Sequence, residues 1–459
     1  MLLTVTGTGP RSRARALAAA LRAAVRDGTL PAGTRLPPSR ELAADLRLSR
    51  GVVTEVYGQL LAEGYLTARQ GAGTWVAELP GAVTVPPPAP PPRPHSGPPP
   101  TDFRPGLPDL SLFPRAAWSA AQRQALAQLP DAALDYPDPR GLPRLREELA
   151  RLLARRRGVA VHPDGIVVCA GVSQALTLLA RVLHARGHRR IAVEDPGSPP
   201  QAPLFAAAGL KTVGVPVDGE GVDVAALRAT GVRAVVVTPA HQFPHGVVLS
   251  AARRSELLDW ARSCGGLVVE DDYDGEFRYD RAPVGALQGL APDQVAYTGS
   301  VSKLLAPALR LGWVVPPPAL LEELVEAKRT ADLGTSVPDQ AALAAFAAGG
   351  RLDRQLRLCQ RAYRARRDVL VAELTAAFPG LRVSGIAAGL HVIAEFPAAA
   401  GPRARLERAA AEAGVRLRHL DEYAISKGAP SLRLRYVLGY AHLREPVLRA
   451  GVRALAARL

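Results

Sequence analysis

The chain has 459 residues, enough for two or three domains that each bury a core of their own. Hydrophobic residues make up 48% and charged residues 22%, which is typical of a globular protein, and no apolar run approaches the ~20 residues needed to cross a bilayer. The formal net charge of +15 predicts a polyanionic partner, nucleic acid first, unless it reflects only a compositional preference for arginine.

The cysteines and the N-terminus indicate a cytoplasmic protein. Cys169, Cys264 and Cys359 lie far apart and form no C-x-x-C pair, which argues against a disulfide framework or a zinc site, so we expect no bound metal. The first residues, "MLLTVTGTGPRSR", contain no apolar segment after a basic start, so a signal peptide is not expected.

Residues 1–78 predict a small module of three helices and a hairpin. Apolar residues recur at helical spacing over residues 13–27, and Ser39 and Ser49 are expected to cap the second and third helices. The stretch "GYLTARQGAGTWVAE" then predicts two short strands around its glycines. Helices followed by a hairpin in this order are typical of a winged helix-turn-helix, an α+β fold that binds double-stranded DNA.

The outward polar residues of this module are the expected DNA contacts. The N-terminal end of the third helix would read base edges, the preceding turn and helix would contact phosphates, and the hairpin tip would reach the backbone or minor groove. A solvated basic face without DNA contacts is the alternative. The expected contacts are Arg35, Arg40, Ser49, Arg50, Thr54, Arg69 and Gln70.

The segment "LPAGTRLPPSRELAADLRLSRGVVTEVYGQLLAEGYLTARQGAGTWV" resembles the DNA-binding domain of GntR-type bacterial regulators. The resemblance covers nearly the whole module. Such regulators often have a polar residue and Thr after the Ser-Arg pair, whereas this chain has Gly51 and Val52, so no base preference is carried over.

Residues 79–100 predict a linker because about half of the positions are proline. A segment of this composition cannot pack a core and extends by ~3.1 Å per residue. It separates the small module from a large domain over residues 101–459.

The large domain predicts an α/β fold. Short apolar runs such as "GIVVCA", "RIAVED", "AVVVTP", "GLVVEDD" and "QVAYTGS" alternate with helical stretches. This alternation favours a mostly parallel sheet with helices on both faces, in which ligands bind beyond the carboxyl ends of the strands.

The polar residues after these strands predict a pyridoxal phosphate site. Lysine occurs only four times among 57 Lys and Arg, and Lys303 follows a predicted strand, with Arg310 shortly after it. A desolvated lysine can attack a carbonyl, which arginine cannot do. Ser173 opens a helix suited to a phosphate, while Asp271 and Tyr273 follow another strand and would contact the ring nitrogen and hydroxyl.

The motifs "YPDPRGLPRLREELARLLARRRGV", "VEDPG", "TPAHQFPHG", "EDDYDGEFRYD" and "SKLLAPALRLGW" resemble the fold-type I aminotransferase domain of the MocR subfamily of GntR regulators. The resemblance implies that Lys303 forms the Schiff base with the cofactor, that Asp271 pairs with the ring nitrogen and that Tyr273 contacts the ring hydroxyl. It also implies a homodimer. The residues around the phosphate would be Ser173, Gln174, Ser300, Ser302 and Arg310. His241 and Gln242 would lie near the ring, and Tyr136 would approach the site from the other subunit.

One position departs from the family pattern. Relatives usually have an aromatic residue after "DPG" that lies over the cofactor ring, but this chain has Ser198 followed by two prolines. We therefore expect weaker retention of the cofactor.

Three functions are compatible with these features. The first is a transcriptional regulator whose large domain senses pyridoxal phosphate, or an amine or amino acid. The second is a working aminotransferase with a DNA tether, and the third is a DNA-binding protein whose large domain has lost the cofactor and only dimerises. Arg433 and Arg435 are the candidates to anchor an effector carboxylate, although they do not align securely, which favours the regulator.

Overall fold

The computed structural model describes residues 10–69, 73–78, 101–280, 284–426 and 431–459. Its contacts divide the chain into two compact units, Met1–His95 and Ser96–Leu459. Gln70, one of the expected DNA contacts, lies outside the described residues.

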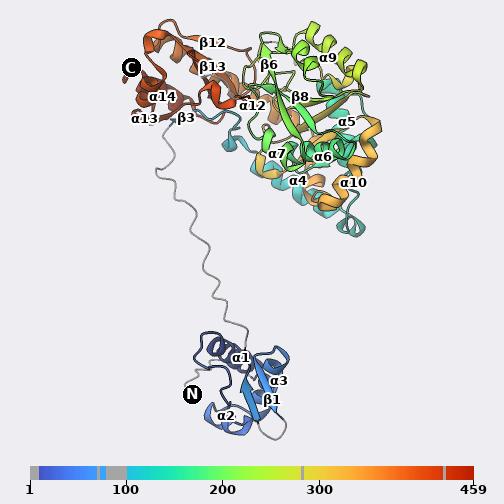
Figure 1. Cartoon of the computed structure of the whole chain (residues 1–459), viewed down its shortest axis with the longest axis vertical. Helices are drawn as coiled ribbons and strands as arrows, with labels where there is room; N and C mark the ends of the chain where they lie inside the picture. Colours follow the sequence, from blue (N-terminus) through green and yellow to red (C-terminus); the bar gives the residue numbers. More distant parts are fainter. Residues whose placement is uncertain (1–9, 70–72, 79–100, 281–283, 427–430) are drawn as a thin grey trace. The chain divides into compact units, whose positions relative to one another are not determined.

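The described residues of the N-terminal unit form three helices and two antiparallel strands (Figure 1). Its elements are α1 (Pro10–Arg26), α2 (Ser39–Asp45), α3 (Arg50–Ala62), β1 (Leu66–Arg69) and β2 (Gly73–Val76). Leucines of α1 pack against the buried valines of α3. The Ser49 side chain caps α3 by accepting a hydrogen bond from the backbone N–H of Val52, as expected. The expectation for Ser39 is wrong by one residue, because Pro38 holds the extended N-cap conformation and Ser39 is already helical.

A mixed eight-stranded sheet forms the centre of the large unit, in the order β4-β11-β10-β9-β8-β5-β6-β7. The strands from β10 to β6 in this order are parallel, which confirms the expected core of the sheet. β11 runs antiparallel between β10 and β4, and β7 closes the other edge. The strands are β4 (Val167–Cys169), β5 (Arg190–Asp195), β6 (Lys211–Asp218), β7 (Gly221–Val222), β8 (Ala234–Val237), β9 (Leu267–Asp272), β10 (Val295–Ser300) and β11 (Gly312–Val315).

Helices cover both faces of this sheet because neighbouring strand residues point to opposite sides. Val269 packs with α6 (Val172–Ala185), α7 (Gln201–Ala207) and α10 (Leu321–Asp332), whereas its neighbour Val268 packs with helices of the other face. The helices of that other face are α4 (Arg115–Gln128), α5 (Pro143–Arg157), α8 (Val224–Ala229), α9 (Ala251–Cys264) and α11 (Val337–Ala348).

The C-terminal part of the large unit forms a subdomain with its own antiparallel sheet, β12-β13-β15. The long helix α12 packs against α14, and β14 pairs in parallel with β3 at the start of the unit (Figure 1). The elements are β3 (Thr101–Asp102), α12 (Arg351–Ala377), β12 (Arg382–Ser384), β13 (His391–Phe396), α13 (Arg403–Glu412), β14 (Val415–Arg416), β15 (Leu434–Gly439) and α14 (Glu445–Ala456).

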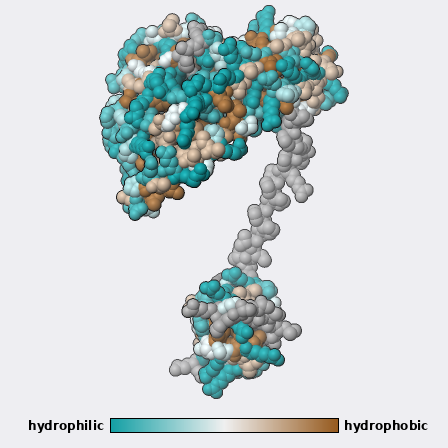
Figure 2. All heavy atoms as spheres, turned by 180° about the vertical axis from the view of Figure 1, so that it is seen from behind, coloured by the Kyte–Doolittle hydropathy of each residue, from teal (hydrophilic) through white to brown (hydrophobic). Residues whose placement is uncertain are grey.

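None of the helices in the described residues is long and apolar enough to cross a membrane. Figure 2 shows mostly hydrophilic residues on the visible face of the large unit, with hydrophobic residues scattered among them.

Candidate functional site

A cavity of about 510 Å³ opens at the carboxyl ends of β8 and β9 in the large unit. Its walls combine residues at or after the carboxyl ends of four central strands, β5, β8, β9 and β10, with segments from the start of the unit and from the C-terminal subdomain. The lining residues are Arg104, Pro105, Gly106, Ser198, Pro199, Pro200, Thr238, Phe243, Asp271, Tyr273, Lys303, Arg418, Glu422 and Tyr423. The structure thus brings Lys303, Asp271, Tyr273 and Ser198 together at one site.

Lys303 enters the cavity from the turn that follows β10. Its Nζ donates a hydrogen bond of 2.6 Å to the backbone carbonyl oxygen of Gly106. Burial lowers the pKa of this amine, while the carboxylates of Asp274 and Asp271 act in the opposite direction. A lowered pKa increases the share of neutral amine, which is the form that attacks a carbonyl.

The two aspartates at the end of β9 have different environments. Asp272 is held by the guanidinium of Arg157 at 2.7 Å and by the hydroxyl of Tyr297 at 2.6 Å. Asp271 lines the cavity, and its buried Oδ1 has no partner among the described residues. Burial, followed by the charge of Asp272, raises the pKa of Asp271 to about 7. This oxygen is therefore available to a hydrogen-bond donor that enters the cavity.

Tyr273 and His241 contact each other beside the cavity. The Tyr273 hydroxyl lies 3.0 Å from His241 Nδ1, and the same nitrogen lies 2.9 Å from Asp274 Oδ2. His241 is buried and is not part of the cavity lining. Gln242 is also buried, and its amide nitrogen donates to Glu194 and to two backbone carbonyls, so it holds the loop together.

The N-terminus of α6 forms a cationic cradle with Arg310. Gly171 is the N-cap with φ 86°, and a Cβ added there would lie 3.0 Å from the Arg310 guanidinium. Ser173 is exposed in the first turn of α6, and the backbone N–H of Ser302 donates to Ser300 Oγ at 3.3 Å. Free helix amides and a guanidinium form an arrangement that suits a phosphate.

Gln174 has its own partners within the chain. Its Oε1 accepts a hydrogen bond from the backbone N–H of Ala170 at 2.7 Å, and its Nε2 donates to Asp332 Oδ2 at 2.7 Å. These bonds connect the loop before α6 to the end of α10, so the Gln174 side chain stabilises the loop at the N-terminus of α6.

Tyr136, Arg433 and Arg435 lie away from the cavity lining, and so do the expected phosphate contacts Ser173, Gln174, Ser300, Ser302 and Arg310. Tyr136 is 81% exposed, in a surface hollow with Leu134 and Leu333. Arg433 is exposed beside Glu395, and Arg435 pairs in register with Glu395 across β13 and β15.

The cavity also contains residues that the sequence reasoning missed. Arg104 and Arg418 supply cations, and Phe243 and Tyr423 supply aromatic surface. The rings of Phe243 and Tyr423 contact each other edge to face, with centroids 5.2 Å apart. The proline-containing "HQFPHG" motif could have indicated Phe243 as a site residue. Nothing in the local sequence distinguishes Arg104, Arg418 or Tyr423.

The expected DNA contacts within the described residues are all exposed on the N-terminal unit. Arg50 and Thr54 lie in the first turns of α3, and Arg40 lies in α2. Arg35 and Arg69 lie near the ring of Trp75, with guanidinium carbons 5.7 and 5.3 Å from the ring centroid. Such contacts favour a fixed orientation of the two arginine side chains.

The fold and the site together define a winged helix-turn-helix protein with an aminotransferase-type α/β domain. Residues 13–76 match the model of bacterial regulatory proteins of the gntR family, and residues 107–449 match that of aminotransferase class I and II. The chain belongs to the MocR subfamily of GntR transcriptional regulators.

Relatives and solved structures support this assignment. The pyridoxine biosynthesis transcriptional regulator PdxR of Corynebacterium glutamicum is 34% identical over 396 residues, covering 84% of this chain and 83% of its own. The probable rhizopine catabolism regulatory protein MocR of Rhizobium meliloti is 34% identical over 458 residues, covering 95% and 91%. The α-aminoadipate aminotransferase LysN of Thermus thermophilus, solved with N-(5'-phosphopyridoxyl)-L-leucine, is 28% identical with a TM-score of 0.68, covering 78% and 91%.

Proposed function

We propose that this protein regulates transcription by binding DNA through its N-terminal module and by sensing a ligand at a pyridoxal 5'-phosphate site around Lys303. The observation that carries the proposal is the unpartnered, buried Oδ1 of Asp271 in the same cavity as the Lys303 amine. An amine and a free acceptor oxygen at one site match the aldehyde and the protonated ring nitrogen of that cofactor.

The other residues expected at the site also fit pyridoxal phosphate. Arg310 and the amides of α6 would hold the phosphate, with Ser173, Ser300 and Ser302 beside them. The Tyr273 hydroxyl would contact the ring hydroxyl, and Asp271 would accept a hydrogen bond from the ring nitrogen. When bound, pyridoxal phosphate supplies an aldehyde that condenses with primary amines.

We propose that the effector is pyridoxal phosphate itself, or an amine or amino acid that competes for the aldehyde. Arg104 and Arg418 line the cavity and would attract an anionic ligand, while Phe243 and Tyr423 offer an apolar wall. Arg433 and Arg435 do not line the cavity, so a carboxylate anchor of the kind expected for a working aminotransferase finds no support at those positions.

The domain limits and the assembly belong to the same proposal. We assign residues 1–78 to DNA binding, 79–100 to the linker and 101–459 to the effector domain, with the whole protein acting as a homodimer in the cytoplasm. The exposed side chains of Leu134, Tyr136 and Leu333 support a subunit interface around their hollow, from which Tyr136 would approach the partner's site.

Spectroscopy combined with DNA binding tests this function. Purified full-length protein is titrated with pyridoxal phosphate and then with amino acids, while its visible spectrum and its binding to a selected genomic fragment are followed. We expect colour to develop with the cofactor and the DNA affinity to change with cofactor or amine. Turnover of an amino acid and a keto acid would support the aminotransferase instead, and a protein that stays colourless would support the dimerisation role.

A further inference from the structure

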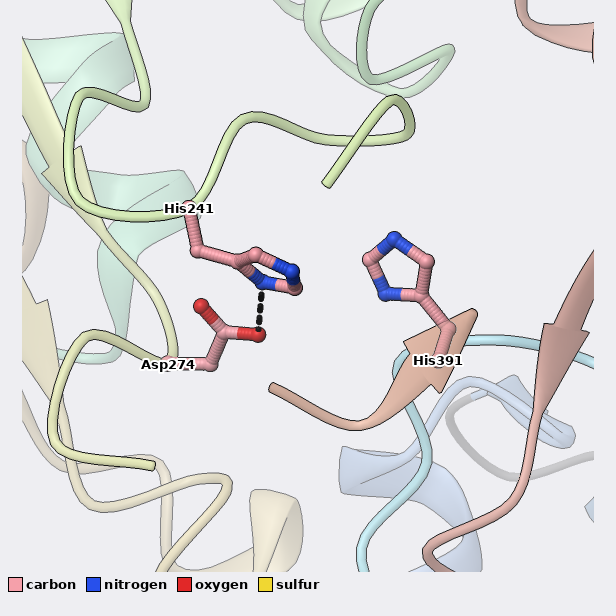
Figure 3. A group of neighbouring side chains, drawn as sticks. All are labelled: His241, Asp274 and His391. Atoms are coloured by element: carbon pink, nitrogen blue, oxygen red, sulfur yellow. Dashed lines mark hydrogen bonds and ion pairs between the residues drawn. The ribbon is translucent and has the colours of Figure 1, made fainter. Parts of the chain in front are cut away.

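Two histidines and an aspartate form a buried group beside the cofactor cavity (Figure 3). His241 follows β8, Asp274 follows β9, and His391 begins β13 of the C-terminal subdomain. The three side chains offer ligand atoms that all lie within 4.8 Å of one another. All three residues are nearly inaccessible to solvent, with exposed fractions of 2%, 4% and 2%.

The hydrogen bond of His391 determines which of its nitrogens is free. Its Nε2 lies 3.1 Å from the backbone carbonyl oxygen of Pro244, which can only accept, so Nε2 carries the hydrogen. Nδ1 then presents a lone pair, and this buried atom has no partner among the described residues. A ring N–H that donates to a backbone carbonyl while the other nitrogen stays free is the arrangement found in histidines that bind metals.

Asp274 also has unused ligand capacity. Its Oδ2 lies 2.9 Å from His241 Nδ1, whereas its Oδ1 is buried without a partner in the described part of the chain. A buried carboxylate requires a compensating cation or several hydrogen bonds. Asp274 interacts electrostatically with the Lys303 amine, but no lysine or arginine in the described residues forms an ion pair with it.

The backbone keeps the group compact. A Cβ added at Gly389, which has φ 68°, would lie 2.2 Å from His241 and 2.4 Å from Asp274. The Gly389 carbonyl oxygen accepts hydrogen bonds of 2.7 Å from the hydroxyls of both Tyr279 and Tyr440. A larger side chain is therefore excluded, and the segment before His391 is anchored from two sides.

We propose that His241, Asp274 and His391 bind one divalent transition metal ion, for which Zn²⁺ is the best match. Two imidazole nitrogens and one carboxylate form a ligand set that Zn²⁺ accepts at ~2.0–2.2 Å with a fourth position open. In a tetrahedral site with such bonds the donor atoms lie about 3.4 Å apart, and the ligand atoms of the three residues here already lie within 4.8 Å of one another. The Tyr273 hydroxyl, 3.0 Å from His241 Nδ1, lies next to the site.

Such a metal would connect two parts of the large unit. His241 and Asp274 belong to loops of the eight-stranded sheet, while His391 belongs to the small sheet of the subdomain. The ion would therefore fix the subdomain against the edge that carries the cofactor cavity. The expectation that no metal is bound rested on the spacing of the cysteines, and the cysteines take no part in this group.

Metal titration of the full-length protein tests the proposal. Tag-free protein without pyridoxal phosphate is stripped with a chelator, dialysed, and titrated with Zn²⁺ and, as a coloured substitute, with Co²⁺. We expect one ion per chain by elemental analysis, and Co²⁺ absorption typical of nitrogen and oxygen ligands. Less than stoichiometric binding, or the charge-transfer bands of a Co²⁺–thiolate bond, would overturn it.

Matched variants locate the ion. We expect His391→Ala and the nearly isosteric Asp274→Asn to weaken binding by about a hundredfold, because the first removes a ligand and the second removes the negative charge of one. His442→Ala is the control, since His442 Nε2 also lies 2.9 Å from a backbone carbonyl oxygen and its Nδ1 has no partner among the described residues, yet His442 is not part of the group. Circular dichroism verifies folding. If Asp274→Asn binds Zn²⁺ like the parent, or the His442 variant loses as much affinity, the three residues form only a hydrogen-bonded cluster.

Discussion

The side-chain amine of Lys303 donates a hydrogen bond to the backbone carbonyl oxygen of Gly106, a residue 197 positions earlier in the chain. This contact joins the first segment of the large unit to the turn after β10. The first segment of the large unit thus helps to hold the Lys303 side chain in the cavity.

We predict that borohydride reduction of the protein with pyridoxal phosphate labels Lys303. Lys328 is fully buried and its Nζ is bonded to both carboxylate oxygens of Asp332 at 2.7 Å, so it cannot compete. Peptide mapping by mass spectrometry locates the pyridoxyl group, and Lys303→Arg should abolish both label and visible absorption. A label on Lys211 or Lys328 would contradict the assignment.

Replacing Arg50 should weaken DNA binding. Arg50→Ala removes an exposed cation from the first turn of α3, and a base-reading arginine contributes about 1–3 kcal/mol. Fluorescence anisotropy with a genomic fragment selected by the parent protein measures the change, and binding should fall steeply with salt. Arg155→Ala, which removes an exposed arginine of the large unit, is the control and should bind DNA like the parent. Equal losses in both variants would refute an interface on α3.

Introducing an aromatic side chain at Ser198 should slow the loss of pyridoxal phosphate. Ser198 lines the cavity, and a stacked ring adds about 0.5–1.5 kcal/mol beyond burial, so Ser198→Tyr should tighten binding several-fold. Spectrophotometric titration gives the dissociation constants of pyridoxal phosphate for the two proteins. Ser198→Ala is the control for loss of the hydroxyl. If the parent already binds as tightly as the tyrosine variant, Phe243 or Tyr423 covers the ring instead.

Glu194 should make the stability of the protein without cofactor depend on pH. Burial raises its pKa from 4.5 to about 7, although Thr238 and Gln242 donate hydrogen bonds to it. The folded chain then keeps a proton that the unfolded chain has released, so this contribution to the free energy of unfolding is complete below pH 4.5 and is lost as the pH rises through 7.

The variant Glu194→Gln keeps the shape and acceptor of the side chain and removes its titration. Urea unfolding at pH 5, 6, 7 and 8 should show that the free energy of unfolding falls less with pH in the variant than in the parent. It should still fall to some extent in the variant, because burial also raises the pKa of Asp271 and Glu270 to about 7. Identical slopes in the two proteins would exclude Glu194 as a source.

A charge at Leu134 should weaken the proposed dimer. Leu134 is 61% exposed in the hollow that contains Tyr136, and burying an unpaired carboxylate in an interface is costly. Analytical ultracentrifugation should show Leu134→Glu dissociating at concentrations at least tenfold higher than the parent, or about 1.4 kcal/mol. Leu290→Glu, at a position with 63% exposure outside the hollow, should remain dimeric. A parent protein that is monomeric at micromolar concentration would contradict the proposal.

The sequence predicted the parts of the site that follow continuous apolar strands. Asp271 lies at the end of β9, Tyr273 follows it, and Lys303 follows β10. Because the carboxyl ends of parallel strands lie at the same edge of a sheet, the sequence predicted that these residues lie at one edge. Arg418 and Tyr423 reach the same cavity from the C-terminal subdomain, more than a hundred residues later. Local periodicity contains no information about such approaches, which depend on how the subdomain packs. The bond between Gln174 and Asp332, 158 residues apart, was hidden for the same reason.

The parallel pairing of β3 with β14 determines at which part of the large unit the chain enters it after the N-terminal unit. Thr101 is the first described residue after the linker, and its strand pairs with Val415–Arg416 of the C-terminal subdomain, beside α14 (Figure 1). The chain therefore enters the large unit at the small C-terminal subdomain, through β3, before it reaches the large sheet that carries Lys303 and Asp271. A ligand that shifted this subdomain would also shift β3, the strand at which the large unit begins.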